Sequence, residues 1–199
     1  MKRVIAMQKL NINEIFYSIQ GEGYRVGTPN IFIRLTGCNK QCPFCDTDYN
    51  KGTWYYLGEL REYIQQHFPC KNIIWTGGEP TLQLNNEITK YFNDYGYYQA
   101  IESNGINEIP DYIDYISISP KGEINCNIKQ VNEIRLLYPY FFNNQLISNL
   151  KCKYDNLYLS PAFNDFKPNY DNINKCIQLI KENPKWKLSI QIHKLIDIK

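Results

Sequence analysis

The chain has 199 residues, with 22 basic and 20 acidic side chains and a formal net charge of +2. A charge so close to neutral excludes a dedicated polyanion binder, because no basic excess is available to neutralise a run of phosphates. Seven cysteines, in a chain that begins MKRVIAMQKL without a long apolar stretch, argue against a secreted disulfide scaffold. No window approaches the roughly 18 apolar residues that span a bilayer, so we expect a cytoplasmic protein with reduced thiols.

Short apolar runs typical of buried strands recur along the chain. Strands are predicted over 31–36, 73–76, 98–102, 115–119, 133–137, 157–160 and 188–192. Between them, helices are predicted over 57–68, 85–95 and 171–183. This alternation implies an α/β fold with a mostly parallel sheet. Since a complete eight-stranded barrel takes about 250 residues, the sequence predicts a single domain over 1–199, an incomplete TIM-type barrel with a reduced helical layer.

Polar motifs follow the carboxyl ends of the predicted strands. In chain order they are Gly37-Cys38, Gly77-Gly78-Glu79-Pro80, Glu102-Ser103-Asn104-Gly105, Ser119-Pro120-Lys121, Ser160-Pro161 and His193-Lys194. Each motif alone has an ordinary explanation as a turn, because Gly, Pro, Ser and Asn are common there. In parallel α/β sheets, however, ligands bind at the carboxyl edge. The repetition of polar motifs along this edge therefore predicts one shared pocket.

The most specific local pattern is the triplet Cys38, Cys42 and Cys45, with the spacing C-x3-C-x2-C. Three thiolates so close in sequence can ligate one metal centre from a single loop. Structural zinc sites usually have four ligands in two pairs, and the nearest further candidates, His67 and Cys70, lack a partner at suitable spacing. Three soft thiolates suit a [4Fe–4S] cluster with one open iron, while zinc and buried structural thiols remain alternatives.

With Phe44 before its last cysteine, this motif resembles that of the radical S-adenosylmethionine superfamily. In that superfamily three cysteines hold a [4Fe–4S] cluster whose fourth iron binds S-adenosylmethionine, and GGEP at 77–80 resembles its methionine-binding strand end. Further segments are similar to the 7-carboxy-7-deazaguanine synthase family, in the same order from position 15 to 194. They are SIQGEG at 18–23, Arg34, Cys45-Asp46-Thr47, ESNG at 102–105, SPK at 119–121 and QIHK at 191–194.

The resemblance implies a lyase that converts 6-carboxy-5,6,7,8-tetrahydropterin to 7-carboxy-7-deazaguanine with release of ammonia, a step toward queuosine-type deazapurines. It implies a radical mechanism in which S-adenosylmethionine acts catalytically, with a [4Fe–4S] cluster and Mg2+ as further cofactors. It also implies a homodimer, and a reductase or flavodoxin-type protein as electron donor. Neither a nucleic acid nor a membrane is expected as a partner. Short N-terminal and C-terminal extensions would contribute to the substrate pocket.

The resemblance also implies roles for single residues. Cys38, Cys42 and Cys45 would ligate the cluster, and Thr47 would bind Mg2+, whereas the adjacent Asp46 need not. The expected cofactor-binding residues are Phe44, Gly77, Gly78, Glu79, Ser103, Ser119, Lys121 and Ser160. The expected substrate-binding residues are Gln20, Gly21, Glu22, Arg34, Glu102 and His193. A pterin edge suits Gln and Glu, and a carboxylate suits the donor fork of Arg. No residue is assigned as acid or base.

Several readings stay open. Arg34 could be a strand arginine with a surface partner, and His193 an ordinary half-buried histidine. The chain has Ser160 where the family commonly has Gln, and ESNG where it commonly has Thr. Packing is predicted for the cysteines without ligand spacing, which are Cys70, Cys126, Cys152 and Cys176. The stretch 123–155 matches nothing usable. The alternative functions are a glycyl-radical-enzyme activating enzyme acting on a protein partner, and a zinc-binding interaction module.

Overall fold

The computed structural model describes residues 5–45, 47–122, 124–125, 127–142, 152–164 and 167–199. The predictions for Asp46 and Cys126 lie outside these residues. Contacts divide the chain into two compact units. Unit 1 comprises Met1–Ser18, Pro29–Ser103 and Asn107–Ile116, and unit 2 comprises Ile19–Thr28, Asn104–Ile106 and Ser117–Lys199. The single domain over 1–199 stays a prediction.

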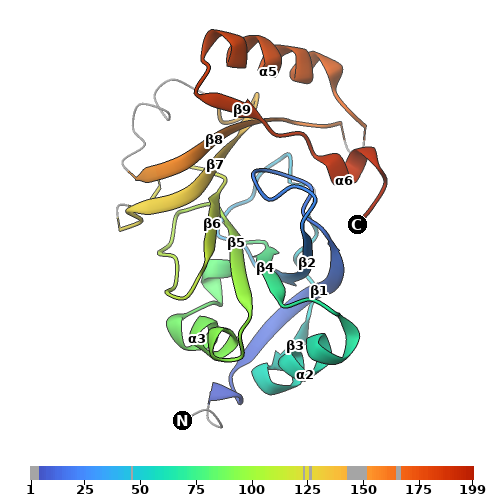
Figure 1. The fold of residues 1–199 in the computed structure, drawn as a ribbon, viewed down its shortest axis with the longest axis vertical. Helices are drawn as coiled ribbons and strands as arrows, with labels where there is room; N and C mark the ends of the chain where they lie inside the picture. The colour runs from blue at the N-terminus through green and yellow to red at the C-terminus, as the bar shows by residue number, and fades with distance from the viewer. Residues whose placement is uncertain (1–4, 46, 123, 126, 143–151, 165–166) are drawn as a thin grey trace. The chain divides into compact units, whose positions relative to one another are not determined.

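Unit 1 is built on strands in the hydrogen-bonded order β3-β1-β2-β4-β5-β6 (Figure 1). Their bounds are β1 Lys9–Ile19, β2 Pro29–Leu35, β3 Thr53–Tyr56, β4 Asn72–Gly77, β5 Tyr98–Ser103 and β6 Tyr115–Ile118. β3 pairs antiparallel with β1, whereas β4 is parallel to both of its neighbours. Trp75 lies opposite Ile33 on one side and Ile101 on the other, and all three are fully buried. The parallel strands bring their carboxyl ends to one edge of the unit.

Two helices bury their apolar residues in the core of unit 1. α2 (Leu57–His67) lies beside β3, and α3 (Asn86–Asp94), which follows the short 3-10 helix η1 (Pro80–Leu82), lies beside β5 (Figure 1). Leu60 and Ile64 of α2 join Phe92 of α3 in one apolar cluster with the strands. α3 begins after Asn85, whose Oδ1 accepts from the backbone N–H groups of Glu87 and Ile88.

Unit 2 contains the end of β6, followed in hydrogen-bonded order by β7 (Gln130–Tyr138), β8 (Lys153–Pro161) and β9 (Trp186–Leu188). These strands are parallel to one another. α5 (Tyr170–Glu182) contacts β8 and β9 and contains the fully buried Cys176, and the short α6 (Ile192–Leu195) follows (Figure 1). None of the helices in the described part of the chain is long and apolar enough to cross a bilayer.

The predicted fold class is confirmed: the sheet is mostly parallel and open, consistent with a partial TIM-type barrel. The three predicted helices are present, and no end is shifted by more than one residue. One strand prediction is wrong beyond its first residue, because β9 ends at Leu188 and Ile192 already begins α6. The backbone of this segment bonds elsewhere, since the Ile192 N–H donates to the Gly21 carbonyl. β1 was not predicted because polar residues interrupt its apolar pattern, and β3 was not predicted because it has only four residues.

Truncation of the unit 1 core should cost stability without touching the site. Leu60 is fully buried, so Leu60→Ala is expected to lower the free energy of unfolding by about 3 kcal/mol, the usual cost of an uncollapsed core cavity. Urea denaturation followed by circular dichroism measures this. Leu195→Ala removes the same atoms from a side chain that is 48% exposed and should cost less than about 1 kcal/mol. Equal losses in the two variants would contradict the assigned core.

Candidate active site

The predicted site residues divide between the two units. Unit 1 contains Arg34, Cys38, Cys42, Phe44, Cys45, Thr47, Gly77, Gly78, Glu79, Glu102 and Ser103. Unit 2 contains Gln20, Gly21, Glu22, Ser119, Lys121, Ser160 and His193. Within each unit, residues far apart in the sequence come into direct contact, as described below.

The three cysteines of the triplet lie in the loop that follows β2. Cys38 and Cys42 are half-buried, Cys45 is exposed, and all three are free thiols. The loop turns tightly, since the Cys45 N–H donates to the Cys42 carbonyl at 3.0 Å. Among the described residues, no three His, Cys, Asp or Glu side chains gather closely enough to hold one metal ion. In a [4Fe–4S] cluster each cysteine binds a different iron, so the thiols need not converge on one point.

The electrostatics of this loop favour a cationic ligand. Burial raises the pKa of the Cys38 thiol, a backbone hydrogen bond at Lys40 lowers it, and the negative charges of Glu79, Cys42 and Cys45 raise it further. Thiolates formed in this loop would therefore repel one another and the carboxylate. A metal centre relieves the repulsion, because thiolate ligands bind it in their deprotonated form. A cavity of about 580 Å3 opens beside Cys38 and is also lined by Gly37, Tyr49 and Lys40.

The glycine pair after β4 brings the backbone directly against the cysteine loop. The Gly78 N–H donates to the Leu35 carbonyl at 3.1 Å, and the Glu79 N–H donates to the Gly37 carbonyl at 2.8 Å. A Cβ atom at Gly78 would lie 1.9 Å from the Gly37 oxygen and 3.0 Å from the Cys38 Cβ. Gly77 has a φ of +133°, a conformation that side chains rarely adopt. The sequence Gly77-Gly78 is thus required for the strand end to approach the loop.

Substitution at Gly78 should therefore disturb the cysteine loop. Gly78→Ala places a methyl group against backbone, which cannot move aside as a flexible side chain could. We expect iron incorporation after anaerobic reconstitution to fall at least about fivefold, as a backbone shift of this kind costs roughly 1–3 kcal/mol. Gly58→Ala is the matched control, because its methyl group would make ordinary contact with Ala6 and alanine favours a helix. Full iron content in Gly78→Ala would contradict the close approach.

The Glu79 side chain is held in one orientation inside unit 1. It is 1% exposed, and its Oε1 accepts from the Thr81 backbone N–H at 3.1 Å, the Thr81 hydroxyl at 2.6 Å and the Ser103 hydroxyl at 2.8 Å. Ser103 at the end of β5 is itself buried. Three donors to one oxygen fix the position of the carboxyl group. The ends of β4 and β5 thereby build a fixed anionic group close to the cysteines.

Arg34 lies on β2, where it makes contacts with both neighbouring segments. Its Nε lies 3.5 Å from Glu14 Oε2 on β1, and its Nη1 donates to the Thr47 hydroxyl at 3.4 Å. Its guanidinium also lies over the Phe16 ring at 5.8 Å. The alternative explanation of Arg34, a strand arginine with a surface partner, therefore has such a partner in Glu14. Contact with Thr47 nevertheless places Arg34 beside the predicted Mg2+ ligand.

In unit 2, the loop that carries Gln20, Gly21 and Glu22 packs against the segment after β9. The Ile192 N–H donates to the Gly21 carbonyl at 3.0 Å, and the Gly23 N–H donates to the Ser189 hydroxyl at 3.0 Å. A Cβ at Gly21 would lie 2.1 Å from His193 Nδ1, so glycine is needed for the histidine ring to lie there. The segments SIQGEG and QIHK, far apart in sequence, are therefore joined in the fold.

The remaining predicted cofactor residues of unit 2 lie at strand ends. The Lys121 ammonium donates to the Ser119 hydroxyl at 2.6 Å, and it also lies 5.0 Å from the centre of the Phe141 ring. Ser160 is 5% exposed, and its hydroxyl has no hydrogen-bond partner among the described residues. A buried hydroxyl without a partner costs free energy, which a ligand with a donor or acceptor would recover.

The prediction missed a buried charged pair on β7. Glu133 and Arg135 are 2% and 5% exposed, and Arg135 pairs with Glu22 at 2.9 Å. The sequence could have indicated this pair. Charged residues at alternating positions of an apolar strand require partners inside the fold.

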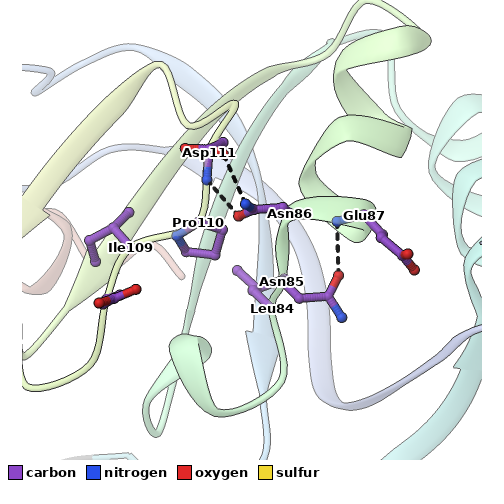
Figure 2. A pocket seen from close by; sticks show the side chains of 8 residues that line it. Leu84, Asn85, Asn86, Glu87, Ile109, Pro110 and Asp111 are labelled. Carbon is purple, nitrogen blue, oxygen red and sulfur yellow. Dashed lines mark hydrogen bonds between the residues drawn. The ribbon is translucent and has the colours of Figure 1, made fainter.

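A second cavity lies away from these residues in unit 1. It measures about 540 Å3, and Figure 2 shows Asn86, Pro110 and Asp111 around it. Its polar groups already serve the fold, because the Asn86 amide and Asp111 exchange two hydrogen bonds and Asn85 caps α3. None of the predicted site residues lines it.

The described cysteines outside the triplet pack as predicted. Cys152 and Cys176 are buried, and Cys70 is half-buried with hydrogen bonds to the backbone at Pro29 and Asn72. Burial raises the pKa of Cys176 to about 12, so its thiol stays protonated and unreactive near neutral pH.

The residues present fit a cluster and a sulfonium cofactor on the grounds given above. Three free thiols share one loop of unit 1, and the glycine pair leaves no room for a side chain beside it. The thiols of the loop are soft ligands of the kind that iron–sulfur clusters have. The Glu79 carboxyl group is of the kind that binds an ammonium group.

Comparisons with known proteins agree with this arrangement. The profile of the radical SAM superfamily matches residues 32–184. A 7-carboxy-7-deazaguanine synthase from Haemophilus influenzae is 43% identical, over 94% of this chain and 93% of its own length. One from Bacteroides thetaiotaomicron is 37% identical, over 94% and 98%. The crystal structure of QueE from Escherichia coli has a TM-score of 0.77 at 24% identity and covers 96% of this chain and 98% of its own, which shows the same fold.

These relatives favour the synthase over the activating enzyme and the zinc module. The cysteine triplet, the glycine pair and the joined SIQGEG and QIHK segments are the features on which the prediction rested. The chain is an enzyme with a [4Fe–4S] cluster and S-adenosylmethionine as cofactors, and it belongs to the 7-carboxy-7-deazaguanine synthase family of the radical SAM superfamily.

Proposed function

We propose that this enzyme converts 6-carboxy-5,6,7,8-tetrahydropterin to 7-carboxy-7-deazaguanine with release of ammonia. The observation that carries the proposal is the packing of the Gly21 loop against His193, because these residues lie in the two segments that separate this family from other radical enzymes. When bound, the cluster and S-adenosylmethionine supply the radical chemistry. The chain itself binds and orients the pterin and excludes water from it.

The proposed cofactor residues follow from the groups described above. Cys38, Cys42 and Cys45 would ligate the cluster, and Glu79 would meet the ammonium group of S-adenosylmethionine. The remaining cofactor-binding residues would be Phe44, Gly77, Gly78, Ser103, Ser119, Lys121 and Ser160. Hydroxyl and ammonium donors at strand ends suit the ribose and carboxylate of this cofactor.

The proposed substrate residues have chemistry that matches the two ends of the pterin. Its amino-pyrimidinone edge carries N–H donors, which suit the Glu22 carboxylate and the Gln20 amide oxygen. Its carboxylate suits the Arg34 guanidinium. Gly21, Glu102 and His193 complete the proposed substrate set, and the first and last segments of the chain would in this way both contribute to a single radical-SAM domain over 1–199.

Mg2+ is proposed as a third cofactor, with Thr47 as a ligand. Arg34 and Mg2+ would repel each other unless an anion lay between them, and the substrate carboxylate is such an anion. Arg34 donates to the Thr47 hydroxyl at 3.4 Å, a long contact that would give way when this oxygen binds Mg2+ and the guanidinium binds the carboxylate. Mg2+ takes few protein oxygens and leaves positions for a substrate, so its removal should weaken binding of the carboxylate end.

The proposed compartment, oligomeric state and electron donor are those that the family resemblance implies. We propose a cytoplasmic homodimer that receives electrons from a reductase or flavodoxin-type protein. Reduced thiols in the cysteine loop, which the cluster requires, fit this compartment.

Product analysis tests the proposed reaction. The reconstituted enzyme is incubated anaerobically with S-adenosylmethionine, dithionite and carboxytetrahydropterin, with and without Mg2+. We expect a product with the mass and ultraviolet spectrum of 7-carboxy-7-deazaguanine, formed faster with Mg2+. A pterin left unchanged while iron content is complete would refute the proposal, and equal rates at both Mg2+ conditions would refute the Mg2+ site.

A further inference from the structure

The buried charges on β7 have no role in the site as described so far. Arg135 is 5% exposed and Glu133 is 2% exposed, on a strand whose opposite face carries the buried apolar residues Ile134 and Leu136. Burying an ionised group costs several kcal/mol unless hydrogen bonds and an opposite charge compensate. A fold that needed only a core here would be served by apolar side chains.

The guanidinium of Arg135 binds the Glu22 carboxylate and two neighbouring side chains, Ser117 and Glu133. Nη1 donates to Glu22 Oε2 at 2.9 Å. Nη2 and Nε donate to the Ser117 hydroxyl at 2.8 and 3.2 Å, and Nε lies 3.1 Å from Glu133 Oε1. Burial lowers the pKa of Arg135 and the charge of Glu22 opposes this, while an arginine stays cationic even when buried. Glu22 is thus held by a fixed positive charge.

Glu133 holds the backbone of the same loop. Its Oε2 accepts from the Tyr24 N–H at 2.9 Å, and its Oε1 accepts from the Ser117 hydroxyl at 3.0 Å. A Cβ at Gly23 would lie 2.3 Å from Glu133 Oε1, so the glycine lets the carboxylate reach the backbone. Gly23 also adopts a φ of +70°. The pair therefore binds the loop at two successive points, the Glu22 side chain and the Tyr24 amide.

The geometry leaves part of Glu22 available to a ligand. Its Oε2 is bound by Arg135, whereas its Oε1 has no hydrogen-bond partner among the described residues, and the side chain is 23% exposed. One oxygen thus anchors the carboxylate while the other can accept an N–H group. Fixing such a group before the ligand arrives lowers the entropy cost of binding.

We propose that Glu133 and Arg135 are positioning residues, which together fix the loop of residues 20–24 and orient the Glu22 carboxylate toward the substrate. This rests on the proposed function, because it takes Glu22 as a substrate-binding residue. Neither β7 residue needs to touch the pterin itself. Their effect should appear in the affinity for the pterin rather than in the rate of the chemical step.

Equilibrium binding tests this without turnover. The dissociation constant of carboxytetrahydropterin is measured with reconstituted enzyme and S-adenosylmethionine but no reductant, for Arg135→Gln, Arg135→Lys and the control Arg61→Gln. Arg61 contacts Gln65 and the Tyr95 ring in unit 1, so its variant tests arginine loss alone. Arg135→Gln should weaken binding about 10- to 100-fold, the loss of one charge-assisted hydrogen bond. Arg135→Lys should recover part of this loss, and Arg61→Gln should bind as the wild type.

Steady-state kinetics and a double-mutant cycle separate positioning from mere stability. KM should rise about as much as the dissociation constant, while kcat changes less than about threefold. Adding Glu22→Gln to Arg135→Gln should weaken binding by less than about threefold more, because the second change removes a group already misplaced. Full additivity of the two changes, or a fall in kcat without a change in KM, would overturn the proposal.

Hydrogen exchange tests, without any substrate, whether Glu133 and Arg135 fix the loop of residues 20–24. The Gly23 and Tyr24 amides should exchange at least about tenfold faster in Arg135→Gln or Glu133→Gln, and at the wild-type rate in Arg61→Gln. If the wild type does not convert the pterin, the proposed function fails, while faster loop exchange still supports the positioning pair. If Arg135→Gln does not fold, Glu22→Gln removes the same ion pair from the half-exposed side. Unchanged loop exchange in the folded variants would overturn the proposal.

Discussion

Replacing any one of Cys38, Cys42 and Cys45 with alanine is expected to abolish turnover, with a loss of at least about a thousandfold. The three thiols lie in one loop, and the reaction has no path around the metal centre that they would hold. Iron content and the broad absorbance near about 400 nm, typical of thiolate-ligated iron–sulfur clusters, should fall with activity. The measurement is anaerobic reconstitution followed by iron and sulfide analysis and product formation.

Two other cysteines provide matched controls for this experiment. Cys70→Ala and Cys176→Ala remove thiols that hydrogen bond to backbone or pack in the core. Both should retain full iron content and turnover, although Cys176→Ala should lose about 1 kcal/mol of stability because the residue is fully buried. A zinc content that replaces iron in the wild type, or full turnover in Cys42→Ala, would overturn the cluster assignment.

Glu79→Gln is expected to raise the dissociation constant for S-adenosylmethionine about 100-fold. The substitution removes the negative charge of a side chain that three donors hold in place at Oε1. A neutral amide does not attract the ammonium as a carboxylate would, and loss of a charge-assisted hydrogen bond costs about 1.5–3 kcal/mol. Isothermal titration with S-adenosylmethionine on the reconstituted enzyme measures the change.

The control for this substitution is Glu87→Gln. Glu87 is exposed at the start of α3 and accepts a hydrogen bond from Gln8. Its variant should bind S-adenosylmethionine as tightly as the wild type. Equal affinity in Glu79→Gln and Glu87→Gln would contradict the role assigned to Glu79, whatever the two variants do to stability.

Elements with a strong apolar period could be predicted from the sequence, and those with a mixed pattern could not. The helix of Leu57, Leu60 and Ile64 follows from spacing alone, and the structure buries all three. β1 contains polar residues such as Asn11 and Glu14 between apolar ones, so local pattern did not identify it. Its pairing with β3 depends on residues more than forty positions away. A long-range contact also explains the error at β9. The apolar sequence suggested a strand to Ile192, but the Ile192 N–H donates to the Gly21 carbonyl.

The site shows the same division between local motif and distant contact. The cysteine spacing and Gly77-Gly78 could be read locally, and the clash at a Gly78 Cβ explains why glycine stands there. The support of Glu22 by Arg135 could not be predicted, because the two are separated by 113 positions in the chain. Charges at alternating positions of β7 showed only that some partner was needed. Which carboxylate they would meet depends on the folded unit.

The most direct test of the account is the stoichiometry of an anaerobic assay with carboxytetrahydropterin and S-adenosylmethionine. Wild-type enzyme should form 7-carboxy-7-deazaguanine and ammonia in equal amounts, many times over for each S-adenosylmethionine consumed. Addition of Mg2+ should increase the rate. Consumption of S-adenosylmethionine with no deazaguanine formed, by enzyme with complete iron content, would contradict the account.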